Sequence, residues 1–210
     1  MIPIEYFEEL PSTQIYLLEG IKTHQLSSPI CIVARKQTAG IGSRGNVWEQ
    51  VQEALTFSFS LKSFELPLDL PLQSASIFFG FIFKEVLNLM GFDIWLKWPN
   101  DLYIKNSKVG GVIVNIYKDN IVCGIGLNIY GKEYASLEKQ IHKIEVLEEF
   151  LKKIRNTYKW KEIFSKYELE FDRNFGFSFH QGNEIFDLKG AKLLPDGGIY
   201  LNGKKIYSFR

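Results

Sequence analysis

The segment Lys97-Trp-Pro-Asn-Asp101 places polar and charged side chains where an apolar, strand-like stretch is interrupted. Proline has no N–H to donate and holds the preceding residue in extended geometry, so a strand is predicted to end here with Asn100 and Asp101 at its rim. Lys97 and the nearby Lys108 supply positive charge. Asp101 offers an oxygen ligand for Mg²⁺, and Asn100 can both donate and accept hydrogen bonds. These residue types favour binding of phosphate or carboxylate groups.

Glycines recur close to this segment. Gly110 and Gly111 follow Lys108, and Gly124 and Gly126 lie on the next predicted strand. Because glycine has no side chain, a ligand can lie directly against the backbone at these positions. Each feature alone would also fit an edge-strand turn, but together they indicate a ligand site.

A glycine-rich loop spans residues 40–48. Its glycines leave backbone N–H groups unobstructed and Arg44 adds a guanidinium fork, which suits phosphate or carboxylate oxygens. Residues 40–45 also match the GxGxxG pattern of dinucleotide-binding folds, which requires a strand directly before the first glycine and a helix near the last. Residues 36–39 intervene here and an alternating strand follows, so a Rossmann fold is not favoured.

The histidines and cysteines form no recognisable catalytic or metal-binding pattern. His24, His142 and His180 lie in separate segments without metal-ligand spacing, and no serine is grouped with a histidine and an acid. Cys31 and Cys123 each lie alone in an apolar run, which is typical of small buried side chains in a reducing compartment. The chemistry is therefore predicted to depend on positioning and charge stabilisation.

Apolar periodicity predicts the elements that position these residues. Apolar residues alternate with polar ones over 55–61, as in a strand with one buried face. Ser12 is expected to cap a helix whose apolar residues are Ile15, Leu18 and Ile21. Further strands are predicted at 4–10, 30–35, 94–98, 102–105, 108–117 and 120–128, helices at 72–90, 145–158 and 160–171, and tight turns at 106–107 and 118–119. The later strands should form an antiparallel meander.

The last part of the chain has a different pattern of apolar residues and turns. After residue 175, short strand-like pieces are separated by glycine-containing turns, which predicts a small all-β module. Such a module is too short to be stable alone and should pack on the larger domain. We therefore divide the chain into residues 1–175 and 176–210.

Composition excludes several classes of protein. The 210 residues are 23% charged and 46% hydrophobic, values of an ordinary folded domain rather than a disordered chain. Lys and Arg number 25 against 24 Asp and Glu, so no basic field favours nucleic acid. The most apolar stretch, residues 77–90, is interrupted by charges and too short for a membrane span, and the N-terminus does not resemble a secretory signal. We expect a cytoplasmic protein that binds neither nucleic acid nor membrane.

Together the motifs resemble the biotin protein ligases, enzymes that join biotin to a lysine of carboxylase carrier domains. The similarity covers most of the chain in the family's order: Pro-Ser-Thr at 11–13, Gln37 to Trp48, Lys97-Trp-Pro-Asn-Asp101, Lys108-Val-Gly-Gly111, Gly124-Ile-Gly-Leu-Asn128 and residues 190–201. The resemblance implies an α+β fold, with a mixed, largely antiparallel sheet like that of class II aminoacyl-tRNA synthetases and a small C-terminal SH3-like β module. The sequence has no helix-turn-helix segment before residue 4, so we expect a ligase without repressor function.

The resemblance also implies a reaction. ATP, with Mg²⁺, activates biotin to biotinyl-5′-AMP, and the biotinyl group passes to a lysine of a biotin carboxyl carrier domain. Since the substrates bring their own nucleophiles, the missing catalytic triad agrees with this chemistry. We expect a monomer or a homodimer, the latter pairing through exposed strand edges near residues 115–122.

Site residues follow from the matched positions. Those implied to bind biotin are Ser12, Thr13, Gln14, Gln37, Gly40, Ile41, Gly42, Ser43, Lys108 and Gly111. Those implied to bind ATP are Arg44, Trp48, Asn100, Asp101, Gly126 and Asn128, with Asp101 as the magnesium ligand. Lys108, Arg44 and Lys97 are implied to be catalytic.

Two alternatives compete with this assignment. A lipoate or octanoate ligase or transferase has the same fold, but the transferase needs a nucleophilic cysteine and the ligase an Arg-rich Ser-Gly-Gly-Gly loop. Neither is evident, because Cys123 lies on a predicted core strand. A non-catalytic binding module would retain the glycines but would have no use for Lys97, Asp101 and Lys108 together.

The sequence departs from the family pattern in its glycine-rich loop. Ile41, Ser43 and Asn46 stand where relatives commonly have arginine, and Asn115 stands where glutamate is expected. We therefore expect weaker retention of the adenylate than in most relatives, unless Arg35 or Lys36 supplies the charge.

Restoring an arginine tests this expectation. Ser43→Arg should slow dissociation of the adenylate about tenfold or more, since a charge-assisted hydrogen bond contributes about 1.5–3 kcal/mol. Timing the release of labelled adenylate measures the effect. Unchanged or faster release would contradict the hypothesis.

Overall fold

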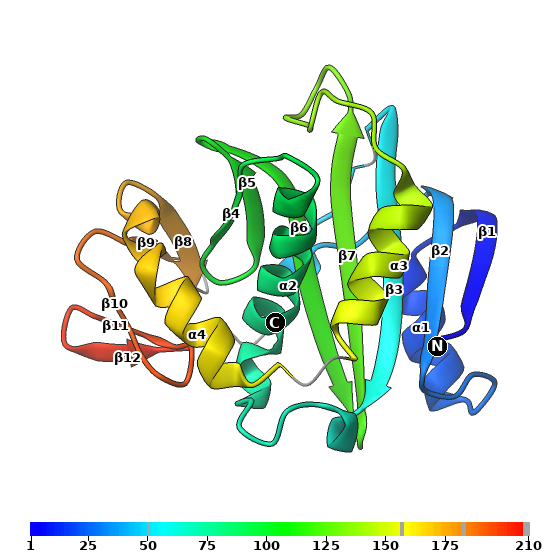
Figure 1. Ribbon diagram of the computed structural model, residues 1–210, viewed down its shortest axis with the longest axis horizontal. Helices are drawn as coiled ribbons and strands as arrows, with labels where there is room; N and C mark the ends of the chain where they lie inside the picture. The colour runs from blue at the N-terminus through cyan, green and yellow to red at the C-terminus, as the bar shows by residue number, and fades with distance from the viewer. Residues whose placement is uncertain (50, 156–157, 182–183, 208–210) are drawn as a thin grey trace.

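The computed structural model describes residues 1–49, 51–155, 158–181 and 184–207, apart from the side chain of Arg44. In these ranges a sheet of seven strands forms the centre of the molecule, in the order β1-β2-β3-β7-β6-β5-β4 (Figure 1). The strands are β1 (Ile4–Leu10), β2 (Ile30–Gln37), β3 (Glu53–Lys62), β4 (Ile94–Lys97), β5 (Asp101–Ile104), β6 (Ser107–Tyr117) and β7 (Asn120–Tyr130). Only the β1–β2 pair is parallel within this sheet; its other neighbouring pairs are antiparallel. The predicted meander is confirmed.

Helices cover both faces of the sheet. Helix α1 (Thr13–Lys22) packs on one face, whereas α2 (Ala75–Leu89) and α3 (Lys143–Lys153) cover the other, and α4 (Trp160–Leu169) packs on α2 (Figure 1). Short 3₁₀ turns lie at η1 (Ser43–Gly45), η2 (Ser63–Glu65), η3 (Leu72–Ser74) and η4 (Phe171–Asn174). None of the helices in the described ranges combines the length and apolarity that a bilayer crossing requires.

Strand β3 is buried on both faces, so the prediction of one buried face is wrong. Phe57 and Phe59 face the α2–α3 layer, where the Phe59 ring centre lies 5.0 Å from that of Phe79. Ser58 and Ser60, on the opposite face, are also fully buried because α1 covers them. The apolar residues of β3 therefore face the α2–α3 layer, and its polar residues face α1 instead of solvent.

Helix α1 begins as predicted, but its predicted apolar stripe is confirmed only in part. The Ser12 hydroxyl caps it by accepting a hydrogen bond from the backbone N–H of Ile15 at 3.4 Å. Ile15 itself is exposed, whereas Leu17 and Ile21 are buried against β2 and β7. The buried stripe therefore also includes the polar Thr13 and Gln14, which the apolar pattern did not indicate.

Some element boundaries differ from the predictions. The first turn of the meander lies at residues 105–106 instead of 106–107, because Lys105 takes a positive φ of 50°. The turn at 118–119 is confirmed. Strand β7 pairs with β3 as well as β6, so residues 120–122 are not an exposed edge.

The C-terminal strands form two small sheets. One pairs β8 (Ser178–Gln181) with β9 (Glu184–Asp187), and the other contains β10 (Lys192–Leu193), β11 (Ile199–Leu201) and β12 (Lys204–Ile206). The indole N–H of Trp98 donates to the Gly197 carbonyl at 3.0 Å, and the Trp98 ring centre lies 4.9 Å from that of Phe179. The module thus shares the main core, as expected of a unit too small to fold alone. The division at residue 175 stays a prediction.

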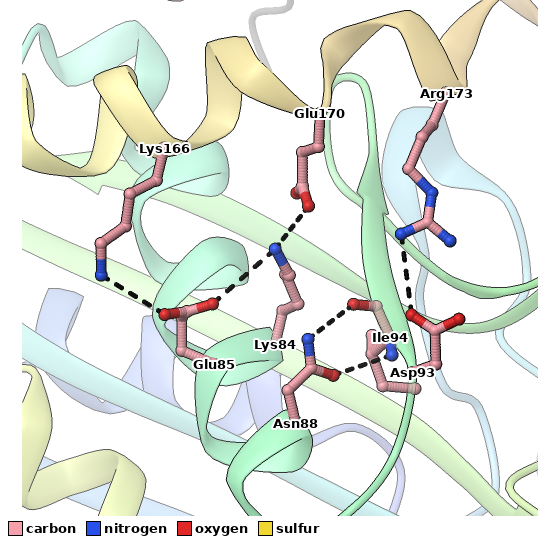
Figure 2. Close-up of polar contacts among 8 residues, drawn as sticks. All are labelled: Lys84, Glu85, Asn88, Asp93, Ile94, Lys166, Glu170 and Arg173. Atoms are coloured by element: carbon pink, nitrogen blue, oxygen red, sulfur yellow. Dashed lines mark hydrogen bonds and ion pairs between the residues drawn. The ribbon is translucent and has the colours of Figure 1, made fainter.

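A buried ion pair joins α2 to the turn that follows α4 (Figure 2). Lys84 is 5% exposed, and its Nζ lies 2.6 Å from Glu170 Oε2 and 3.7 Å from Glu85 Oε1. Burial raises the pKa of Glu170, while Lys84 opposes this shift. Each charge is therefore kept in the interior by its partner.

Removing one residue of the Lys84–Glu170 pair should lower the stability of the fold more than removing both residues. Lys84→Met is expected to lower the free energy of unfolding by about 3–5 kcal/mol, because Glu170 is left charged and buried. The double variant Lys84→Met/Glu170→Met should recover most of this loss. Chemical denaturation at neutral pH measures both variants.

An exposed ion pair supplies a control, and the loss of stability in Lys84→Met should depend on pH. Lys22→Met removes one side of the exposed pair with Glu19 and should cost less than about 1 kcal/mol. The pKa of Glu170 is raised in the folded state, so the Lys84→Met loss should shrink as pH falls and Glu170 takes up a proton. A double variant no more stable than Lys84→Met would contradict this account.

Candidate active site

A pocket lies on the α1 face of the sheet, beneath the loop at residues 40–48. About 430 Å³ of space lies between its lining atoms, part of it open to solvent. It is lined by the start of α1, the end of β2, the loop, the β4–β5 turn and the strands β3, β6 and β7. Its lining residues are Ser12, Thr13, Gln14, Gln37, Ile41, Gly42, Ser43, Trp48, Phe57, Ser58, Asn100, Lys108, Gly111, Val112, Ile113, Gly124, Ile125 and Gly126.

Hydrogen bonds fix the polar side chains at one end of the pocket. The backbone N–H and hydroxyl of Thr13 lie 2.8 and 3.2 Å from Gln37 Oε1, to which both donate. The Thr13 hydroxyl also lies 2.8 Å from that of Ser58 on β3. The Gln37 carbonyl is therefore held toward α1, which leaves its amide N–H₂ turned toward the loop.

Charged side chains gather at the other end of the pocket. Lys108 Nζ lies 2.7 Å from Asp101 Oδ1, and Lys97 Nζ lies 3.7 Å from Asp101 Oδ2. The antiparallel pairing of β5 with β6 places Asp101 opposite Gly111, which brings Lys108 alongside. Two ammonium groups around one carboxylate leave a net positive charge, which favours an anionic ligand.

The turn between β4 and β5 is held from both sides. Asn100 Nδ2 donates to the Val112 carbonyl at 2.7 Å, and Val112 N–H donates to the Asn100 carbonyl at 2.9 Å. The backbone N–H of Trp98 donates to Asn174 Oδ1 at 2.7 Å. Contacts from β6 and from the C-terminal part of the chain thus set the position of Asp101.

The glycine-rich loop folds back over β7. Gly42 N–H donates to the Asn46 carbonyl at 2.7 Å, and Trp48 N–H donates to the Gly40 carbonyl at 2.8 Å. The Trp48 indole lies directly on Gly126, where an added Cβ would be 2.7 Å from the ring. Within the described ranges, the buried Trp48 Nε1 has no hydrogen-bond partner, so it is available to a ligand.

Comparison with known proteins identifies the family. The model of the Biotin/lipoate A/B protein ligase family matches residues 6–128. The chain belongs to this family. Its fold also matches a solved structure of the family, biotin acetyl coenzyme A carboxylase synthetase from Helicobacter pylori with bound biotinylated ATP. That match has a TM-score of 0.97 and 49% identity over 99% of this chain and 100% of that chain.

Other relatives are more distant. The biotin protein ligase from Aquifex aeolicus in complex with biotin and ATP has a TM-score of 0.78 and 27% identity over 100% of this chain and 97% of that one. The chain is 29% identical over 156 residues to biotin–protein ligase 1 of Arabidopsis thaliana, covering 70% of this chain and 40% of the relative. It is 32% identical over 126 residues to the bifunctional ligase/repressor BirA of Escherichia coli, covering 57% and 38%. The chain thus spans about two fifths of these curated relatives' length. The α+β fold implied by the family resemblance is confirmed.

Most residues that the family motifs indicate lie together at the pocket, and some do not. Gly40, Lys97 and Asp101 lie beside its lining, whereas the side chain of Arg44 is outside the described part of the structure. Asn128 donates to the Ala135 carbonyl at 3.0 Å and does not line the pocket. The two proposed substitutes for the missing arginines, Arg35 and Lys36, form ion pairs with Glu8 and Glu9 on β1.

Several lining residues were missed by the sequence analysis. They are Phe57, Ser58, Val112, Ile113 and Ile125. No signal in the sequence indicates Ser58, because its face of β3 is buried only through the contact with α1. The family's motifs do not include it.

Asp101 fits a magnesium ion that arrives with a nucleotide. Among the described residues, no group of three or more His, Cys, Asp or Glu side chains could form a metal site within the protein. Mg²⁺ in nucleotide sites, however, commonly takes one or two carboxylates and completes its shell with phosphates and water. Asp101 Oδ1 is buried and lies 2.7 Å from Lys108 Nζ, so a magnesium ion bound to phosphates would share this carboxylate with Lys108 and Lys97.

The contact between Trp48 and Gly126 predicts a steric effect. Gly126→Ala should destabilise the fold of this family member by about 1–3 kcal/mol, because the new methyl group displaces the indole. Gly111→Ala on the paired strand is the matched control, since its Cβ would meet its nearest atoms at 3.6 Å. Thermal or chemical unfolding compares the two, and equal stability of both variants would contradict the proposed packing.

Proposed function

We propose that the protein activates biotin with ATP to give biotinyl-5′-AMP and then transfers the biotinyl group to a lysine of a carrier protein. The observation that carries the proposal is the position of Lys108 and Asp101, in contact at 2.7 Å, at one end of a pocket whose other end is lined by fixed hydrogen-bonding groups. A ligand with a polar head and a carboxylate fits this arrangement. The similarity to the Helicobacter pylori synthetase, solved with biotinylated ATP, supports it.

The reaction needs no nucleophile from the protein. In the first step a biotin carboxylate oxygen bonds to the α-phosphorus of ATP as the bond to pyrophosphate breaks. In the second step the carrier amine bonds to the acyl carbon, AMP leaves, and the amine loses a proton. Lys108 and Lys97 offset negative charge where the carboxylate and phosphate meet, and the pocket holds the two reactants in line.

Other site residues bind the nucleotide in this proposal. Trp48, Gly126 and Asn100 surround the nucleotide, and the family resemblance adds Arg44 and Asn128 to the residues that bind it. Asp101 would hold Mg²⁺, which when bound neutralises charge on the phosphate oxygens. Gln14 and Gln37, with Ser12 and Thr13, receive the head of biotin.

The partner and compartment follow from the reaction. We infer that the acceptor is the biotin carboxyl carrier domain of a biotin-dependent carboxylase, and that the protein acts in the cytoplasm. Two buried free cysteines support a reducing compartment. Neither a nucleic acid nor a membrane is needed, and a monomer or a homodimer could carry out both steps.

The competing function is that of a lipoate or octanoate ligase or transferase from the same family. The transferase requires a reactive thiol, but burial raises the pKa of Cys31 and of Cys123, which keeps both thiols protonated. Mass spectrometry after incubation with ATP, Mg²⁺ and either biotin or lipoate separates the candidates. We expect retained biotinyl-adenylate and no lipoyl-adenylate; the reverse would overturn the proposal.

A lysine substitution tests the charge compensation. Lys108→Met should reduce the rate of biotinyl-adenylate formation roughly 10²–10³-fold, because removing a group that stabilises developing charge has effects of that size. Lys118→Met, on the β6–β7 turn outside the pocket, is the matched control. Biotin-dependent pyrophosphate release measures both, and an undiminished rate in Lys108→Met would exclude this role.

A further inference from the structure

Gln14 is a buried amide in the first turn of α1, with only 2% of its surface exposed. Its Nε2 donates to Asn115 Oδ1 at 2.9 Å and to the Val122 carbonyl at 3.0 Å. Asn115 and Val122 face each other across the β6–β7 pair. One amide nitrogen therefore bridges two neighbouring strands of the sheet.

These two bonds fix the orientation of the amide. A backbone carbonyl only accepts hydrogen bonds, so the group facing Val122 must be the N–H₂ of Gln14. Asn115 adds a second acceptor, because its Oδ1 is the atom turned toward the same nitrogen. The Gln14 carbonyl oxygen must then point the other way.

The carbonyl oxygen lies beside Gly124, at the wall of the pocket. A Cβ added at Gly124 would lie 2.6 Å from Gln14 Oε1 and 3.0 Å from Ser58 Oγ, and all three residues line the cavity. Gln14 Oε1 is buried and accepts no hydrogen bond from the described residues. A buried acceptor without a donor destabilises the ligand-free protein. A ligand that donates a hydrogen bond to this oxygen would remove that cost.

We propose that Asn115 is a positioning residue that holds the Gln14 carbonyl toward the pocket, where it accepts an N–H of the biotin ureido head. This inference rests on the proposed function and deepens it. The dithiolane head of lipoate has no N–H, so it would leave Gln14 Oε1 buried and unpaired. A site built to pair with an N–H rejects a ligand that lacks one, which makes the Gln14–Asn115 pair a determinant of specificity within the family.

The geometry explains why Asn115 acts at a distance. Its own side chain is largely exposed, and it does not line the cavity. It reaches the ligand only through Gln14, whose side chain crosses from α1 to the sheet. Glycine at position 124 leaves the space that Gln14 Oε1 requires.

Binding measurements on three variants test the proposal. Asn115→Leu should raise the Kd for biotin about three- to tenfold, the effect of losing one hydrogen bond between neutral groups. Asn115→Asp retains an acceptor and should stay within about twofold of the wild type. Gln14→Met removes the carbonyl, and adding Asn115→Leu to Gln14→Met should cause no further loss, since both act through one interaction.

Ligand analogues supply the readout that a general structural effect would not give. Biotin methylated at one or the other ureido nitrogen should bind the wild type more weakly than biotin does. For the analogue whose methyl group replaces the N–H paired with Gln14, Asn115→Leu should not change the Kd further. Unchanged biotin affinity in Asn115→Leu, or equal losses for biotin and for both analogues, would overturn the inference. Failure of the wild type to bind biotin would instead overturn the proposed function, and the inference with it.

Discussion

The site depends on the placement of one carboxylate, Asp101, between the ammonium groups of Lys97 and Lys108. The three residues come from three successive strands, so their contact requires both the β4–β5 turn and the β5–β6 register. Contacts with Asn174 and Gly197 hold Trp98, at the start of that turn, against the C-terminal part of the chain. The C-terminal part of the chain, through η4 and the turn before β11, therefore stabilises the geometry of the site, although none of its described residues lines the pocket.

The central sheet divides two tasks between its faces. On one face, Phe57 and Phe59 pack among aromatic rings of α2 and α3, where burial of apolar area stabilises the fold. On the other face, Ser58 lies under α1 and bonds to Thr13, which builds a polar wall for the pocket. A single alternating strand thus serves the core and the site, and shifting its register by one residue would exchange the two.

Much of this arrangement could be predicted from the sequence, because motifs and periodicity are local. Proline at 99 and the paired glycines indicated the ligand site, and the alternation at 55–61 indicated β3. The predictions that were wrong or missing concern contacts between segments that are far apart in the sequence. The second buried face of β3 results from α1, and the partnership of Gln14 with Asn115 joins residues 101 positions apart. Nothing in the neighbourhood of Asn115 indicates its partner, and nothing near Lys84 predicts a buried pair with Glu170.

Two of the buried polar atoms that lack a hydrogen bond among the described residues belong to residues that line the pocket. They are Gln14 Oε1 and Trp48 Nε1, whereas Asp101 Oδ1, beside the pocket, is in ionic contact with Lys108 Nζ at 2.7 Å. A buried polar atom without a hydrogen bond costs about 1–3 kcal/mol, so a fold selected only for stability would pair or remove these groups. One is an acceptor and the other a donor, which together match a ligand with an N–H and an acceptor group. The same groups that weaken the ligand-free protein therefore define what it binds.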